Sequence, residues 1–208
     1  MEFCRFLNQE FKMAIRKKIL LATKNRGKLI EMRTILGTDH FELIPVDTIR
    51  MFPDIPETGD TFEENAIIKA KESFKLTGIP ALADDSGLWV DCLEGRPGVY
   101  SARYAGEDAS DDDNTDKVVE EIKAFSPPYT AKYVCALAYY DGKEIITTEG
   151  ECNGELILER KGTNGFGYDP VFIPTGYKKT MAELDPETKN KLSHRFKAVE
   201  KMKEALTK

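Results

Sequence analysis

Residues 18–36, KILLATKNRGKLIEMRTIL, predict the fold class of this chain. Residues 18–23 form a mostly apolar run of the length expected for a buried β-strand. Apolar residues then recur at helical spacing from Leu29 to Leu36, and the next residue, Gly37, is of a type that often ends a helix. A buried strand that leads through a short loop into a helix is typical of α/β proteins.

The segments that follow predict a mixed sheet, because strands alternate with helices at first and later follow one another directly. Asp141-Gly142 lies between two apolar runs, which is a strong signal for a β-hairpin. Thr61 and Glu64 have the spacing of a helix capping box. The expected strands are 18–23, 41–46, 80–83, 133–139, 144–148, 151–158 and 171–173, and the later helices include 61–76 and 193–206.

The composition argues against several classes of protein. The chain has 208 residues, 41% of them hydrophobic, which is enough for a sizeable core. The formal net charge of −6 argues against a nucleic-acid partner, which requires a basic surface. No apolar run approaches the ~18 residues of a membrane span and no signal peptide is recognisable, so we expect a cytoplasmic protein without a membrane partner.

We expect residues 1–17 to be an N-terminal extension and residues 18–208 to form a single domain. The four cysteines include no CxxC pair, and His40 and His194 are the only histidines. A zinc site is therefore not expected.

The loop after the first strand has the features of an anion site. It combines the hydroxyl of Thr23, the amide of Asn25 and the ammonium of Lys28 with the N-terminus of a helix, where backbone N–H groups attract anions. The alternative is an ordinary strand–helix turn that Asn25 caps. This loop matches neither the phosphate-binding P-loop nor the dinucleotide-binding glycine motif.

Two adjacent acids, Asp84 and Asp85, directly follow the short strand predicted at 80–83. Carboxylates at a strand end can hold a divalent cation, and one of them can deprotonate water. Glu57 could add a carboxylate, as could Glu63 and Glu64, although capping explains Glu64 more simply. The alternative is a turn in which both aspartates bond local backbone N–H groups.

Two further segments carry residues suited to a nucleotide. Three glycines within residues 162–167 permit close approach of a ligand, and Phe166 or Tyr168 could stack on a base while Asp169 accepts from a ring N–H. The alternative places both aromatics in the core. Lys189 and the Ser193-His194-Arg195 motif supply positive charge and a histidine donor, or else form only a capped, solvated helix start.

Together these segments predict an enzyme that acts on a small anion, with metal-assisted attack by water as the available chemistry. A non-catalytic nucleotide sensor is the alternative from another class of protein. A pyrophosphatase for modified pyrimidine or standard triphosphates is the alternative among hydrolases. The acidic run at 111–113 is expected only to begin a helix.

These motifs, in their order and spacing, resemble the inosine triphosphate pyrophosphatase family, also called dITP/XTP pyrophosphatases, over residues 18–207. The matching motifs are Thr23-x-Asn25-x-x-Lys28, Glu57-Thr58-Gly59-x-Thr61-Phe62-x-Glu64-Asn65-Ala66-x-x-Lys69-Ala70, Ala83-Asp84-Asp85-Ser86-Gly87-Leu88, Pro97-Gly98-Val99-Tyr100-Ser101-Ala102-Arg103-Tyr104, Gly165-Phe166-Gly167-Tyr168-Asp169-Pro170 and Ser193-His194-Arg195.

The resemblance implies hydrolysis of ITP, dITP and XTP to the monophosphate and pyrophosphate. It also implies Mg²⁺ as cofactor, a homodimer, and an elongated mixed β-sheet with flanking helices that form two lobes around a central nucleotide cleft. Many family members have glycine where this chain has Lys24, which is therefore left out of the expected site.

The resemblance also assigns roles to individual residues. It implies that Asp85 activates water and that Glu57 and Asp85 bind the metal, with Asp84 a weaker candidate. The implied substrate contacts are Thr23, Asn25, Lys28 and Lys69 at the triphosphate, Ser86 at a further substrate-contacting position, Phe166, Gly167, Tyr168 and Asp169 at the base and sugar, and Lys189, His194 and Arg195 at the 6-keto purine.

Overall fold

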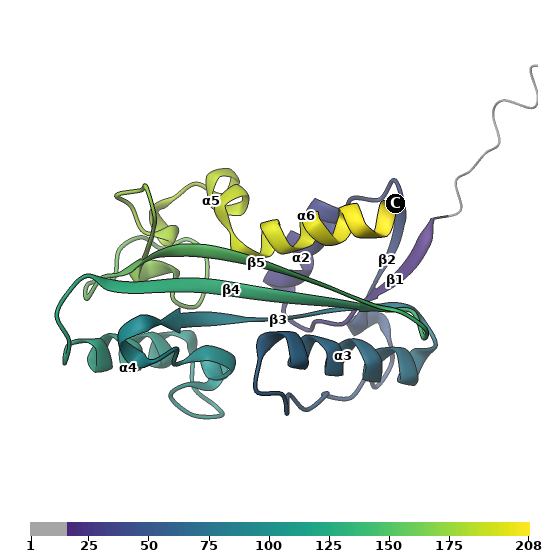
Figure 1. Ribbon diagram of the computed structural model, residues 1–208, viewed down its shortest axis with the longest axis horizontal. Coiled ribbons are helices and arrows are strands. Elements are labelled where there is room, and N and C mark those ends of the chain that lie inside the picture. The colour runs from purple at the N-terminus through teal and green to yellow at the C-terminus, as the bar shows by residue number, and fades with distance from the viewer. Residues whose placement is uncertain (1–15) are drawn as a thin grey trace, which may run out of the picture.

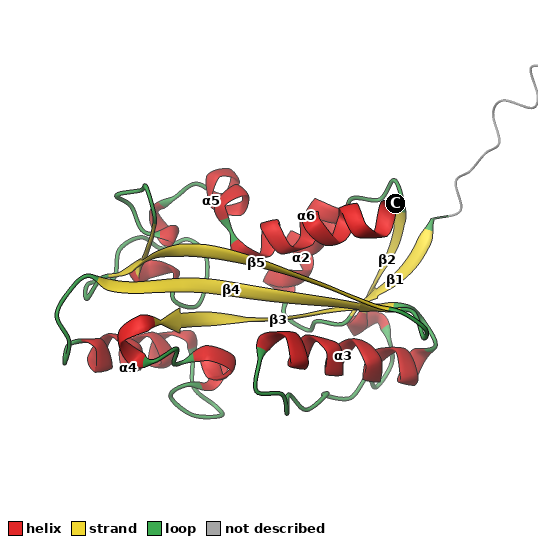
Figure 2. Ribbon diagram, viewed as in Figure 1, coloured by secondary structure: helices red, strands yellow, loops and turns green. Residues whose placement is uncertain are grey.

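A computed structural model describes residues 16–208, and its centre is one sheet with the strand order β2-β1-β3-β4-β5-β6 (Figures 1 and 2). β1 pairs in parallel with β2 and β3, and the remaining pairs are antiparallel, so the predicted α/β class with a mixed sheet is confirmed. The strands are β1 (Lys17–Leu21), β2 (Phe41–Pro45), β3 (Ala81–Val90), β4 (Tyr129–Tyr140), β5 (Ile145–Leu156) and β6 (Phe172–Pro174).

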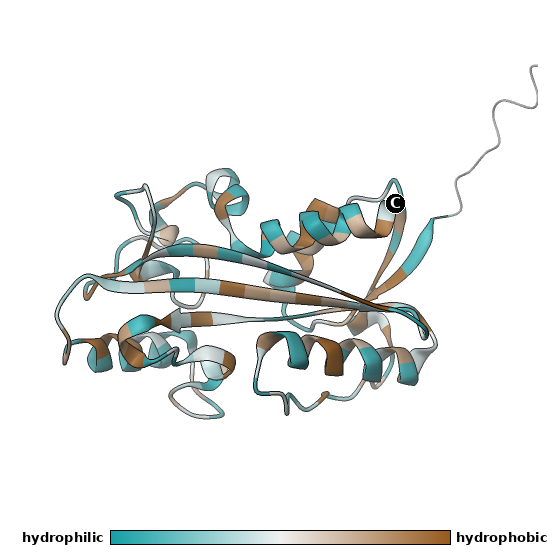
Figure 3. Cartoon of the chain, in the orientation of Figure 1, coloured by the Kyte–Doolittle hydropathy of each residue, from teal (hydrophilic) through white to brown (hydrophobic). Residues whose placement is uncertain are grey.

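Helices cover both faces of this sheet. They are α2 (Arg26–Leu36), α3 (Phe62–Thr77), α4 (Asp111–Ile122), α5 (Pro186–Leu192) and α6 (His194–Thr207). Figure 1 shows α2 and α6 on one side of β4 and β5 and α3 on the other. Brown and teal bands alternate along α3 and α6 in Figure 3, as expected for helices that bury one side against a sheet. No helix within residues 16–208 is long and apolar enough to cross a membrane.

Several of the predicted strand boundaries are wrong, and the strand expected at 133–139 begins earlier, at Tyr129. The strand expected at 80–83 continues to Val90, because residues 81–90 pair along their whole length with β4. The strands expected at 144–148 and 151–158 are one continuous strand, β5, which pairs with all of β4. Most of the expected extension, residues 1–15, lies outside the described residues, and β1 begins at Lys17.

The pairing of β3 leaves room for a site at the centre of the molecule. β1 pairs only with Ala81 and Leu82 of β3, whereas β3 runs on for eight more residues. Asp84 and Asp85 therefore lie just beyond the carboxyl end of β1, within a strand, and not in the turn that was the alternative interpretation. Successive side chains of a strand point to opposite faces, so Asp84 faces α2 and α6, and Asp85 faces α3.

Candidate active site

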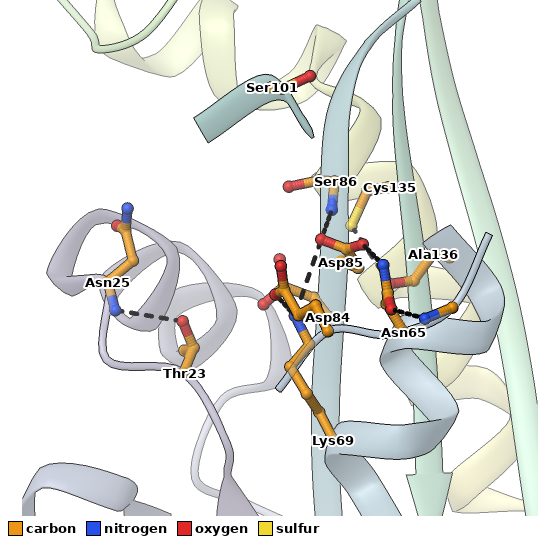
Figure 4. Close-up of polar contacts among 12 residues, drawn as sticks. Thr23, Asn25, Asn65, Lys69, Asp84, Asp85, Ser86, Ser101, Cys135 and Ala136 are labelled. Atoms are coloured by element: carbon orange, nitrogen blue, oxygen red, sulfur yellow. Dashed lines mark hydrogen bonds and ion pairs between the residues drawn. The ribbon is translucent and has the colours of Figure 1, made fainter. Parts of the chain in front are cut away.

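The loop between β1 and α2 forms a capped helix start that borders a cavity. The side-chain oxygen of Asn25 accepts from the backbone N–H of Lys28 at 3.1 Å. The N–H of Asn25 donates to Oγ1 of Thr23 at 3.3 Å (Figure 4). Asn25, Gly27 and Lys28 line the cavity. Lys24 is exposed and pairs with Asp54 at 2.6 Å.

Asp84 is a buried partner of cations. Its Oδ2 lies 2.8 Å from Nζ of Lys28 and 3.9 Å from Nε of Arg195. Burial alone would raise the pKa of Asp84, but Lys28 and Arg195 outweigh it and lower the pKa to about 2. Asp84 therefore stays charged and neutralises two cations that line the cavity, on the opposite face of β3 from Asp85.

Asp85 and Glu57 meet around one ammonium group, that of Lys69 on α3. Nζ of Lys69 lies 2.7 Å from Oε1 of Glu57 and 3.7 Å from Oδ1 of Asp85. Oε2 of Glu57 also accepts from Arg103 at 3.2 Å. Figure 4 shows Lys69 reaching from α3 toward Asp85 on β3. Two carboxylates from distant parts of the chain thus converge on a single positive charge.

The two carboxylates differ in acidity. Burial raises the pKa of Asp85, and the nearby charge of Glu57 raises it further, against the opposing effect of Lys69. Burial also acts to raise the pKa of Glu57, but Lys69 and Arg103 outweigh it, so this pKa is lowered. Asp85 is therefore the group better suited to take up a proton.

The donor set fits a hard divalent cation. Within the described residues no group of three or more His, Cys, Asp or Glu side chains gathers closely enough to hold a metal by itself. Mg²⁺, however, is commonly held by one or two carboxylates together with water and substrate phosphates. Glu57 and Asp85 supply two such carboxylates, and both already face a cation.

A cavity of about 320 Å³ lies beside these carboxylates. Most of the predicted substrate-binding residues line it, whereas Thr23, Glu57, Lys69 and Asp85 lie outside its lining. The predicted residues in the lining are Asn25, Lys28, Ser86, Phe166, Gly167, Tyr168, Asp169, Lys189, His194 and Arg195.

Asp169 organises the glycine-rich loop at one wall of the cavity. Its Oδ2 accepts from the N–H of Phe166 at 2.9 Å and lies 2.7 Å from Nζ of Lys189. A Cβ at Gly165, which has a φ of +84°, would lie 2.1 Å from that oxygen, so the turn requires glycine there. Phe166 is 39% exposed, whereas Tyr168 is buried and also belongs to the core.

His194 and Arg195 also line the cavity, at the start of α6, which Ser193 caps. The ring of His194 stacks on Tyr133 at 4.9 Å, and its buried Nδ1 has no hydrogen-bond partner among residues 16–208. Burial, together with the charges of Arg195 and Lys28, lowers the pKa of His194 well below its usual value. Arg195 is buried, pairs with Glu31 and donates to Oγ of Ser86 at 3.3 Å.

The comparison with known proteins decides the family. Residues 19–205 match the model of the Ham1 family. This chain belongs to the Ham1 family. That membership confirms the family expected from the motifs, because relatives in it are named as dITP/XTP pyrophosphatases.

Two curated relatives and one solved structure illustrate the similarity of this Ham1-family chain. A dITP/XTP pyrophosphatase of Oceanobacillus iheyensis is 46% identical over 193 residues, covering 91% of this chain and 98% of the relative. The dITP/XTP pyrophosphatase of Bacillus subtilis is 46% identical over 196 residues, covering 93% of this chain and 99% of the relative. The structure of a HAM1 protein from Coxiella burnetii superposes with a TM-score of 0.86 at 43% identity, covering 92% of this chain and 98% of that protein.

Several residues of this Ham1-family site received no role in the sequence analysis. Asn65 and Arg103 contact the two carboxylates, and Glu31 and Tyr133 contact the two residues at the start of α6. Helical spacing could have indicated two of them, since Glu31 follows Lys28 by three residues and Asn65 precedes Lys69 by four.

The acidic run at 111–113 begins α4, as predicted, but it does more than start a helix. Asp111 also lines the cavity, and its Oδ2 accepts from the backbone N–H of Gly167 at 2.8 Å. The start of α4 therefore holds the glycine-rich loop, a contact between segments far apart in the sequence.

Proposed function

We propose that this chain hydrolyses the non-standard purine nucleoside triphosphates ITP, dITP and XTP to the monophosphate and pyrophosphate, and so removes them from the nucleotide pool. It is a nucleoside triphosphate pyrophosphatase, a hydrolase of phosphoric anhydride bonds. The observation that carries the proposal is the pair formed by Glu57 and Asp85 around one cation, beside a cavity with an aromatic and cationic lining. The names of the relatives support the substrate class.

Glu57 and Asp85 would hold Mg²⁺ in this proposal, with phosphate oxygens and water as its other ligands. The ion, when bound, supplies positive charge that stabilises the phosphates as negative charge develops during attack. Asp85 accepts a proton from a water directed at the α-phosphorus, which suits a carboxyl group with a raised pKa. Lys28 and Lys69 supply positive charge for the departing pyrophosphate.

Selectivity for a 6-keto purine follows from the direction of hydrogen bonding at His194 and Arg195. A 6-keto oxygen accepts hydrogen bonds, whereas the 6-amino group of ATP donates them. The guanidinium of Arg195 can only donate, so in bound ATP the 6-amino group, also a donor, would lie against a donor. Each buried, unpaired polar group costs roughly 1–3 kcal/mol. GTP shares the keto group, and we propose that crowding or an unsatisfied N–H at its 2-amino group excludes it.

Three further expectations belong to this proposal. Residues 18–208 act as one domain whose two lobes enclose the nucleotide, two copies of the chain form a homodimer, and the enzyme works in the cytoplasm. Each of them stays a prediction.

The proposal is tested by measuring pyrophosphate release from ITP, dITP, XTP, GTP and ATP, each with and without Mg²⁺. We expect fast release from the first three that depends on the metal, and slow release from GTP and ATP. Equal rates on all five would retain the enzyme class and refute the keto-purine pocket. Binding of ITP without any release would favour a nucleotide sensor instead.

A further inference from the structure

Asn65 connects the two segments that carry the carboxylates. It lies in the first turn of α3 and is fully buried, although asparagine is mostly an exposed residue. Its Nδ2 donates to Oδ2 of Asp85 at 3.0 Å (Figure 4). Its Oδ1 accepts from the backbone N–H of Gly59 at 2.7 Å. One side chain thus joins β3 to the loop that contains Glu57.

The chemistry of both partners requires an amide at this position. The Gly59 N–H can only donate and the Asp85 carboxylate, when ionised, can only accept, so the group between them must present an acceptor to one and a donor to the other. This requirement also sets the orientation of the amide. An aspartate at position 65 could keep the bond from Gly59 but would place an acceptor against an acceptor at Asp85.

The loop lies too close to α3 for any larger residue at Gly59. A Cβ on Gly59 would lie 2.9 Å from Oδ1 of Asn65 and 2.6 Å from Cβ of Glu64. Oε2 of Glu64 also accepts from the N–H groups of Asp60 and Thr61 at 2.8 and 3.2 Å. The loop that follows Glu57 is therefore anchored to the first turn of α3 by hydrogen bonds from three successive N–H groups.

The Asp85 carboxylate is held at both oxygens. Oδ1 accepts from the backbone N–H of Ser86 at 2.9 Å while Oδ2 accepts from Asn65. A carboxylate has about four lone-pair sites, so each oxygen keeps one for a cation or a water. Two bonds at the two oxygens fix the plane of the group and hence the direction of those remaining sites.

We propose that Asn65 is a positioning residue that orients the Asp85 carboxylate and sets its separation from Glu57. This inference rests on the proposed function for the roles of the two carboxylates. Groups that orient metal ligands in this way typically contribute 10–100-fold to metal affinity or activity. We therefore expect Asn65 to act on the chemical step and on metal binding, and to have little effect on binding of the nucleotide base.

The test compares Asn65→Ala, which loses both bonds, with the isosteric Asn65→Asp, which loses only the bond to Asp85. Ser73→Ala is the matched control, because Ser73 lies on α3, is equally buried, and its hydroxyl has no hydrogen-bond partner in the described part of the chain. We would measure kcat and KM for dITP, the melting temperature, and, for Asn65→Ala, the Kd of Mn²⁺ for the free enzyme by electron paramagnetic resonance.

Both Asn65 variants are expected to lower kcat 10–100-fold with less than a threefold change in KM, and Asn65→Ala to weaken Mn²⁺ binding by a similar factor. Ser73→Ala should match the wild type. Full kcat in Asn65→Asp would overturn the inference, because the bond from Asn65 to Asp85 would then be dispensable and only the bond from Gly59 would matter. Unchanged Mn²⁺ affinity in Asn65→Ala would overturn it as well. A wild type inactive on every nucleotide would refute the proposed function, and Mn²⁺ affinity would still decide the role of Asn65.

Discussion

Asp84 and Asp85 are neighbours in sequence with the same side chain, yet their surroundings give them different chemistry. Asp84 is neutralised by Lys28 and Arg195, whereas Asp85 shares one ammonium with Glu57 and has a raised pKa. From the sequence, two interpretations were open: a pair of acids that holds a cation at a strand end, or a turn that contains both. The alternation of side chains along a strand separates them, and this alternation applies only because β3 continues through them.

Replacement of Asp85 by asparagine should abolish most of the turnover and leave substrate binding nearly unchanged. The amide keeps the size of the carboxylate but cannot accept a proton from water, and general base catalysis typically contributes about 10²–10⁴-fold. Steady-state kinetics on dITP and equilibrium binding of dITP to the variant check this. Weakened binding with a normal chemical step in single turnover would contradict a role as base.

The buried, neutral His194 should make the stability of the protein depend on pH. Its folded-state pKa lies well below the unfolded value of about 6.5, so the unfolded chain binds a proton there that the folded chain does not. The free energy of unfolding should therefore fall as pH drops below about 6.5, by up to about 1.4 kcal/mol per pH unit. Urea unfolding between pH 5 and 8, roughly the range in which histidine titrates, measures this slope. The slope should be smaller in His194→Gln and retained in the variant of the exposed His40.

At the scale of elements, α6 lies directly against β5 and brings His194 and Arg195 to the cavity. A Cβ on Gly150 of β5 would lie 2.1 Å from the carbonyl oxygen of His194 and 2.6 Å from the N of Ala198. Gly150→Ala should therefore displace the start of α6, with a loss of roughly 1–3 kcal/mol in stability and a raised KM for ITP. Thermal unfolding and kinetics check this, with Glu149→Ala, at an exposed neighbour, as control. An unchanged KM would show that α6 does not set substrate affinity.

The elements that depend on local sequence were predicted well. Capping signals at Thr61 and Ser193 mark the starts of α3 and α6 because the capping bonds form within a few residues. The strands β3 and β5 were predicted too short or divided, since their lengths depend on pairing with β4. In the candidate site, too, features that depend on local sequence were predictable, and features that depend on distant segments were not. Its motifs were visible, but the contacts of Asn65, Glu31 and Asp111 with distant segments were not.

For the whole molecule, binding of a nucleotide should stabilise the fold. A ligand at 100 times its Kd that binds only the folded chain stabilises it by about 2.7 kcal/mol, and each kcal/mol shifts the melting temperature by about 2–4 °C in a domain of this size. We expect ITP to raise the melting temperature more than ATP at the same concentration. Differential scanning fluorimetry in EDTA, which prevents metal-dependent turnover, checks this. Equal shifts for both nucleotides would contradict selection at His194 and Arg195.

The parallel pairing of β1 with β3 also has a consequence for the order of folding. β4 and β5 are joined by a short turn and can pair early, whereas β1 meets β3 only after a segment of about 60 residues has closed into a loop. Thr23 and Lys28 follow β1, while Asp85 lies on β3. We therefore expect the nucleotide site to be among the last parts of the molecule to form, so a folding intermediate with only the β4–β5 hairpin in place would have no affinity for substrate.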